Sequence, residues 1–300
     1  MIRYKITEAT LRKMIERESP GWLDDARERT ERFRQDKRYS EEEGNWSAVK
    51  GAFMDIQKSK CAYCEEAFES KEYGKIYHDI EHFRPKNGVN AWPPKSRLNE
   101  FKKLGFDFAA GGDWSDGYYL LAYHPFNYAT ACKACNSVLK KNYFPIGGPR
   151  GLQSDDPKSL KGEKPYLIYP LGNIDGDNPE TLIRFNGIYP EPMATKGHKY
   201  RRARVTIQLF CLDRRERLLK GRAERIIALD MARTIQKNSA ATPEKRQRAA
   251  EHIERLKDLD SAHCNCVRCF DALYQKDASE AESIVAKAND YLNSLKVERE

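Results

Sequence analysis

Two Cys-x-x-Cys pairs are the groups in this chain best suited to bind a metal ion. Cys61 and Cys64 form the first pair, and Cys132 and Cys135 form the second. A gap of two residues lets both thiolates of one turn reach the same ion, and four thiolates complete a tetrahedral structural zinc site. Four buried thiols without a metal are the alternative, and a redox dithiol would need only one such motif. The spacing therefore predicts one structural Zn²⁺.

The segment between the two pairs contains a run of acidic, histidine and basic residues. Alternation of residue types predicts a strand over Lys75–Phe83. Glu81 and His82 are neighbours and would point to opposite faces in the middle of a strand. They can serve one site only at the end of the strand, and Arg84-Pro85 predicts a bend there.

Other polar residues nearby could complete such a site. Asn136 directly follows the last predicted zinc ligand, so a bound zinc would fix the direction of its side chain. Asp79 lies two residues before Glu81, on the same face of the predicted strand, and is a further candidate metal ligand. His78 and His124 are alternative bases, although an isolated histidine is more often structural.

Taken in order, these motifs resemble the HNH, or ββα-metal, nuclease family. More specifically, the chain resembles the PtuB-type HNH proteins of Septu and retron anti-phage systems, over roughly residues 46–225. The matching segments are Cys61–Glu65, Ile80–Lys86, Phe126–Asn127, Cys132–Lys140, Phe144–Pro145, Lys164–Pro170, Asn178–Glu180, Phe185–Gly187 and Arg201–Arg217.

The resemblance implies a role for each residue of the site. It implies that His82 is the general base, that Glu81 and Asn136 bind a catalytic divalent ion, and that Asn127 braces the loop between two strands. The third residue of the family name is usually His, and here it is Asn136. The neutral amide oxygen of an asparagine suits Mg²⁺ or Mn²⁺ better than softer ions.

The implied reaction is metal-dependent hydrolysis of a phosphodiester bond. His82 would take a proton from water, while the ion would bind the phosphate and the leaving oxygen. Four basic residues are candidates for contacts to flanking phosphates, although a solvated surface explains them equally well: Arg84, Lys86, Lys140 and Lys141.

The chain divides into three predicted regions of an α+β protein. These are an N-terminal helical region (1–57), the HNH core with its zinc knuckles (58–150) and a mainly helical accessory region (151–300). Within the core, a second strand is predicted over Tyr118–Tyr123 and a helix over about Tyr128–Lys141. Elsewhere, helices are predicted around Leu11–Ile15, Asp24–Lys37, Trp46–Ile56, Val205–Ala240, Pro243–Leu259 and Ala278–Leu295, with a turn-rich linker at Pro145–Gly162 and short strands in Pro165–Pro192.

Two further segments leave two interpretations open. Residues His263, Cys264, Cys266 and Cys269 are cramped for one tetrahedral site, so that either a second zinc or free thiols can explain them. The basic stretch Lys196–Arg204 either grips nucleic acid or forms the exposed side of a helix.

Composition and charge bound the remaining possibilities. The net charge of +8 permits a polyanionic partner without demonstrating one. No segment reaches the ~18 apolar residues of a membrane span, and the N-terminus is too charged for a secretory signal, so we expect a cytoplasmic protein.

DNA is the expected substrate, and the PtuB resemblance implies an ATPase partner. Cleavage of RNA such as tRNA and a non-catalytic zinc-stapled nucleic-acid-binding module are the alternatives; the presence of Glu81, His82 and Asn136 favours a nuclease over the second.

Overall fold

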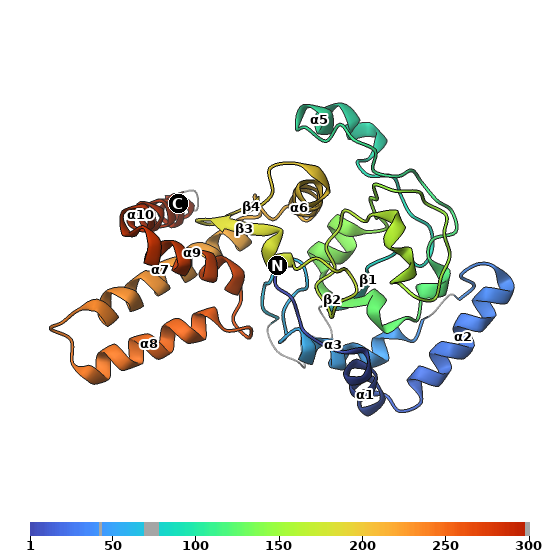
Figure 1. The fold of residues 1–300 in the computed structure, drawn as a ribbon, viewed down its shortest axis with the longest axis horizontal. Helices are drawn as coiled ribbons and strands as arrows, with labels where there is room; N and C mark the ends of the chain where they lie inside the picture. Colours follow the sequence, from blue (N-terminus) through green and yellow to red (C-terminus); the bar gives the residue numbers. More distant parts are fainter. Residues whose placement is uncertain (42–43, 69–77, 298–300) are drawn as a thin grey trace.

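The computed structural model describes residues 1–41, 44–68 and 78–297, and it confirms an α+β protein (Figure 1). Its strands are β1 (His78–His82), β2 (Tyr128–Cys132), β3 (Ile183–Asn186) and β4 (Tyr189–Pro192). Its α-helices are α1 (Glu8–Glu18), α2 (Trp22–Asp36), α3 (Lys50–Ile56), α5 (Leu98–Lys103), α6 (Gly197–Leu209), α7 (Glu216–Lys237), α8 (Pro243–Lys257), α9 (Cys264–Lys276) and α10 (Ala278–Val297). Single helical turns lie at Trp46–Val49, Lys95–Arg97, Tyr119–Leu121, Pro125–Asn127, Ala134–Lys140, Ser159–Glu163 and Pro179–Thr181.

The pair of strands β1 and β2 leads directly into a short helix. The strands are antiparallel, with His78 opposite Cys132 and His82 opposite Tyr128. The helical turn Ala134–Lys140 follows β2 almost at once and is wound as a π-helix, a wide turn that occurs often at functional sites. β1 confirms the second half of the predicted strand, whereas residues 75–77 of that prediction lie outside the described residues.

The predictions for the second strand and the following helix are wrong. Tyr118–Tyr123 contains a buried 3₁₀ turn instead of a strand, and Tyr128–Cys132 is a strand instead of the start of a helix. The reason is a tertiary contact that overrides local propensity. The side chain of Gln57 binds the backbone of Thr130 as a neighbouring strand would, since its Oε1 accepts from the Thr130 N–H and its Nε2 donates to the Thr130 carbonyl, both at 2.8 Å.

Most of the predicted helices are confirmed, and two helices, α5 and α9, are missing from the prediction. The predicted run Val205–Ala240 is divided into α6 and α7 by a break after Phe210, where Cys211 adopts a positive φ of 48°. α9 was not predicted, because its first half contains the cysteines Cys264, Cys266 and Cys269, for which either a second zinc or free thiols remained open. None of the helices in the described part of the chain combines the length and apolar character of a membrane span.

Two hydrophobic clusters hold these elements together. The larger cluster joins the N-terminal helices, β1, β2, the zinc knuckles and α6, so residues 1–57 pack together with the predicted nuclease core. The smaller cluster joins α7, α8, α9 and α10. In Figure 1 the hairpin of α7 and α8 extends to one side of the molecule, away from β1 and β2.

Residues 86–117 form an excursion that carries α5 outward, as Figure 1 shows. The excursion begins and ends at one point, because the Tyr118 N–H donates to the Pro85 carbonyl at 2.8 Å. Its aromatic residues pack on one another at the edge of the larger hydrophobic cluster, with the ring of Trp92 5.1 Å from Phe101 and 5.4 Å from Phe106. The excursion therefore stands on a closed base beside the end of β1.

Candidate active site and structural zinc centre

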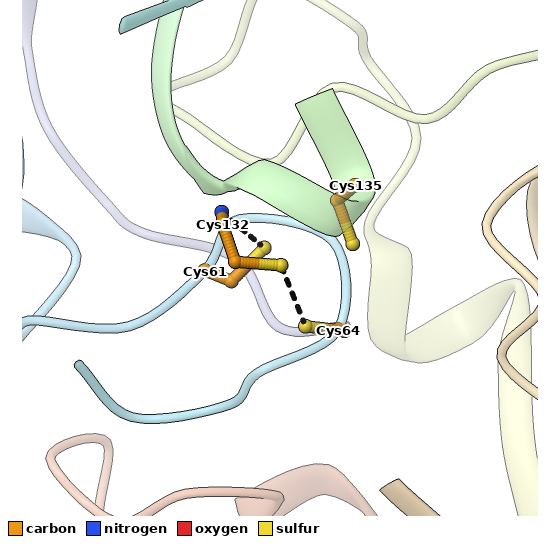
Figure 2. Close-up of side chains that lie close together, drawn as sticks. All are labelled: Cys61, Cys64, Cys132 and Cys135. Carbon is orange, nitrogen blue, oxygen red and sulfur yellow. Dashed lines mark hydrogen bonds between the residues drawn. The ribbon is translucent and has the colours of Figure 1, made fainter. Parts of the chain in front are cut away.

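The four predicted zinc ligands converge on one point (Figure 2). All four cysteines are buried, and their ligand atoms lie within 4.8 Å of one another. Zn–S bonds of ~2.3 Å in a tetrahedron place the sulfurs about 3.8 Å apart. The Sγ atoms of Cys64 and Cys132 are 3.9 Å apart. The donor set and its spacing therefore fit a structural Zn²⁺.

The local backbone explains why the two distant cysteine pairs meet. The first zinc knuckle is the turn from Cys61 to Cys64. In it, the N–H of Ala62 donates to the Thr130 carbonyl of β2 at 3.0 Å. The Cys132 N–H, at the end of β2, points to the Cys61 Sγ at 3.4 Å. A zinc ion here would therefore fix the first knuckle to β2 and to the helix that follows it.

Arg215 is a supporting residue that sequence reasoning missed. Its guanidinium lies 3.2 Å from the Cys135 Sγ and 4.0 Å from the Cys132 Sγ. A zinc ion bound by four thiolates keeps two negative charges, which a neighbouring arginine can offset. The available signal was its place in the segment Arg201–Arg217, which matches the PtuB-type pattern.

The second cysteine group does not form a metal site in the described part of the chain. The Cys264 Sγ faces the Glu65 carboxylate at 3.6 Å, whereas the Cys266 Sγ faces the Gly187 carbonyl at 3.4 Å. The four-cysteine centre is the one cluster there with the geometry of a metal site. Burial raises the pKa of both Cys264 and Cys266 to about 12. These cysteines are free thiols of the core.

A cleft of ≈ 440 Å³ gathers most of the predicted catalytic residues. Glu81 and His82 are the last two residues of β1, where the sequence predicts them, and both line the cleft. Asp79 and Asn136 line it as well. Asn136 is placed by the π-helical turn, in which its carbonyl accepts the Lys141 N–H at 2.8 Å.

The position and the tautomer of His82 are fixed by its surroundings. Its ring lies edge-on between Trp46 and Tyr128, at centroid distances of 4.9 and 5.0 Å. Its Nε2 lies 3.0 Å from the Ala122 carbonyl, which can only accept, so Nε2 carries the hydrogen and Nδ1 keeps its lone pair. The Tyr128 hydroxyl donates to the same carbonyl at 2.5 Å.

Burial keeps the His82 ring neutral. It lowers the pKa of His82 to about 3, and the positive charge of Lys86 acts in the same direction. Lys86 is itself held in place, because its Nζ lies 4.7 Å from the ring centroid of Trp46 and 4.3 Å from that of Tyr39. Sequence reasoning missed Trp46 and Tyr39, whose spacing gives no sign of this arrangement.

Glu81 shares its buried position with Lys140. The Lys140 ammonium forms an ion pair with the Glu81 carboxylate and donates to the His82 carbonyl at 2.9 Å. Burial raises the pKa of Glu81 to about 7, and Lys140 acts against that rise. Lys140 therefore supports Glu81 from within the protein instead of presenting its charge to the solvent.

Asn127 is buried behind the cleft and makes three hydrogen bonds. Its Oδ1 accepts from the Arg84 N–H at 2.8 Å, and its Nδ2 donates to the carbonyls of Arg84 and Leu121 at 2.9 and 3.0 Å. These bonds tie the chain after β1 to the segment before β2. The geometry accords with the bracing role that the resemblance implies.

Besides Asn127 and Lys140, three further predicted candidates lie outside the cleft. Arg84 is buried against Glu163, with its Nε 3.2 Å from the carboxylate, so it cannot contact a phosphate in this arrangement. His124 uses its Nδ1 to accept from the Phe126 N–H, and His78 stacks on Phe68 at 3.6 Å. Of the predicted basic residues, Lys86 and Lys141 line the cleft.

Comparison with known proteins extends the resemblance along the chain. No protein-family model and no solved structure match it. The chain is 26% identical over 246 residues to the Septu protein PtuB of Bacillus mycoides (strain KBAB4), a match that covers 81% of this chain and 72% of the relative. The resemblance to PtuB-type proteins is thereby confirmed over most of the chain.

Proposed function

We propose that this chain is a metal-dependent HNH endonuclease that hydrolyses phosphodiester bonds in DNA as an effector of anti-phage defence. The observation that carries the proposal is the cleft at the end of β1, where His82 presents a free Nδ1 beside Glu81 and Asn136. The succession of β1, β2 and a short helix around a zinc centre supports an HNH core. The likeness to a Septu protein supports the role in defence.

The oxygen donors of the cleft suit a hard divalent cation. Glu81 and Asn136 would hold Mg²⁺ or Mn²⁺, with Asp79 as a further candidate ligand. Such an ion, when bound, neutralises charge on the phosphate and stabilises the leaving oxygen. Asp79, Glu81 and Asn136 all come from β1 or the turn after β2, so the zinc centre and the strand register hold them together.

His82 acts as the general base through Nδ1. The bond from Nε2–H to the Ala122 carbonyl keeps Nδ1 free and stabilises the positive charge that the ring acquires when it takes a proton from water. Burial disfavours that charge in the free protein, whereas the negative charge of a bound phosphate raises the proton affinity of the ring.

Lys86 and Lys141 position the substrate by contacts to its phosphates. The aromatic rings on both sides of Lys86 limit its conformations, so less side-chain entropy is lost when it binds. The proposed partner of this nuclease is an ATPase subunit, as the resemblance to the PtuB-type proteins implies.

Incubation of the protein with plasmid DNA and with total RNA, in Mg²⁺ or Mn²⁺, tests the proposal. We expect cleavage of DNA that EDTA abolishes and that His82→Ala removes. His124→Ala is the matched control, because this histidine lies outside the cleft, and it should retain activity. Full activity of His82→Ala would exclude His82 as the base. Cleavage of RNA but not of DNA would show that the substrate is RNA.

A further inference from the structure

The hairpin of α7 and α8, which extends away from β1 and β2 in Figure 1, carries an open apolar groove. The groove has a volume of ≈ 820 Å³. Met231 and Ile235 lie one turn apart on α7 and are 61% and 42% exposed. Ala232 and Ala249 are buried at its floor, and such small side chains let another backbone approach closely.

The charge on the rim of this groove has one sign. Lys245, Arg248 and His252 of α8 line it, and no carboxylate from the described residues does. Lys245 and Arg248 are both exposed, and neither pairs with a carboxylate in the part of the chain that the structure describes. An apolar surface beside unpaired cations is therefore open to solvent at this end of the molecule.

We infer that the groove docks an amphipathic helix of a partner protein, with carboxylates beside its apolar stripe. The lining spans residues 228–235 of α7 and 245–252 of α8, about two turns of each helix. A third helix laid between them would cover Met231 and Ile235 with apolar anchors at i, i+3 or i+4, and i+7. The cations of the rim would favour an acidic helix over a basic one.

Two other occupants fit the groove less well. A second copy of this chain would place its own Lys245 and Arg248 against the same cations. Nucleic acid would pair with the cations but would leave Met231 and Ile235 uncovered, since phosphates gain nothing from an apolar wall. An acidic amphipathic helix satisfies both parts of the surface.

A binding experiment with synthetic peptides tests the inference on the full chain. The probe is a fluorescent helical peptide of about 18 residues, ~27 Å long, with leucines at the anchor positions and glutamates beside them. Matched peptides carry lysines in place of the glutamates or have the leucines scrambled. We expect fluorescence anisotropy to show binding of the acidic peptide, at least about tenfold weaker binding of both controls, and a similar loss in Met231→Glu.

Charge reversal and a remote control make the experiment decisive. In the double variant Lys245→Glu/Arg248→Glu the preference should shift to the lysine peptide, whereas Leu152→Glu, at a leucine elsewhere that is 49% exposed, should change nothing. Circular dichroism and the melting temperature would report intact folding of each variant. Equal binding of the acidic and lysine peptides, a dimer that Met231→Glu dissociates, or DNA binding lost in the double variant would each overturn the inference. Plasmid cleavage without a partner should be the same in all these variants, which separates this test from that of the nuclease.

Discussion

Substitutions of two adjacent residues, Cys135 and Asn136, should have opposite effects on the stability of the protein. Cys135 is fully buried among the four thiols, and Cys135→Ser removes a ligand of the structural zinc. Such sites contribute on the order of 10 kcal/mol of apparent binding free energy coupled to folding, which is comparable to the whole free energy of unfolding of a domain, about 5–15 kcal/mol. We expect this variant to lose zinc, to melt at a much lower temperature, and to lose cleavage through unfolding.

Asn136→Ala should leave the fold intact. The Asn136 side chain lines the cleft and is partly exposed, whereas its structural contribution is the backbone carbonyl that accepts from Lys141, which alanine retains. Substitutions at such positions usually change the free energy of unfolding within about 0.5 kcal/mol. We expect full zinc content, a nearly unchanged melting temperature, and loss of cleavage together with a weaker response to Mg²⁺ or Mn²⁺.

Elemental analysis, differential scanning calorimetry and plasmid cleavage, applied to both variants, give the answer. Protein purified without chelator should contain one zinc per chain before substitution. If both variants unfold together, Asn136 is structural and Asp79 becomes the first candidate for the ligand of the catalytic ion. If Cys135→Ser keeps its zinc and its melting temperature, the assignment of Cys135 as a zinc ligand is wrong.

Three further substitutions or conditions test other parts of the site. Asn127→Ala would leave one buried N–H and two buried carbonyls without their partner, so we expect a loss of about 3 kcal/mol in urea unfolding with zinc retained, and a loss below 0.5 kcal/mol would contradict the bracing role. Tyr128→Phe removes one hydrogen bond to the Ala122 carbonyl, worth about 1 kcal/mol, and should lower kcat about fivefold with little change in KM; an unchanged kcat would show that this bond does not position the base. Burial lowers the pKa of His82 and His263 to about 3 and that of His124 to about 4. Because the unfolded chain binds these protons from about pH 6.5 downward, the free energy of unfolding should fall between pH 6.5 and 4.5, by up to about 1.4 kcal/mol per pH unit and histidine. Glu81 opposes this fall, since its raised pKa of about 7 lets the folded protein bind a proton in the same range and offsets the effect of one histidine; urea titrations that show a constant value would refute the net fall.

Local patterns predicted the elements whose stability is local. The helix α1 follows from the spacing of its apolar residues, and α2 follows from the alternating charges of a solvated helix face. The strand β2 could not be found this way, because its position depends on Gln57, which lies far from Thr130 in the sequence. The turn at Tyr118–Tyr123 is buried on all sides and so has no alternation that would distinguish a strand from a turn.

The candidate site was predictable where residue type alone limits the chemistry. Thiols at a spacing of two residues predicted the four cysteines that converge on one point, and a bend after His82 predicted the end of the strand. The four basic residues show the limit of such reasoning, since Arg84 and Lys140 are buried in ion pairs while Lys86 and Lys141 line the cleft. A sequence gives the charge of a side chain but not its partner, and burial decides which cations remain available to a phosphate.

The closed base of the excursion that carries α5 separates the length of this segment from the geometry at the end of β1. Its two ends meet at the bond between Tyr118 and Pro85, and Asn127 holds the adjoining Arg84 from the other side. Once both ends are fixed, doubling the length of a flexible loop costs only about 0.6 kcal/mol. A change in the length of this segment can therefore cost little chain entropy while His82 and Ala122 keep their geometry. In the nuclease that we propose, a change in what is recognised could then be made in the excursion without any change to His82.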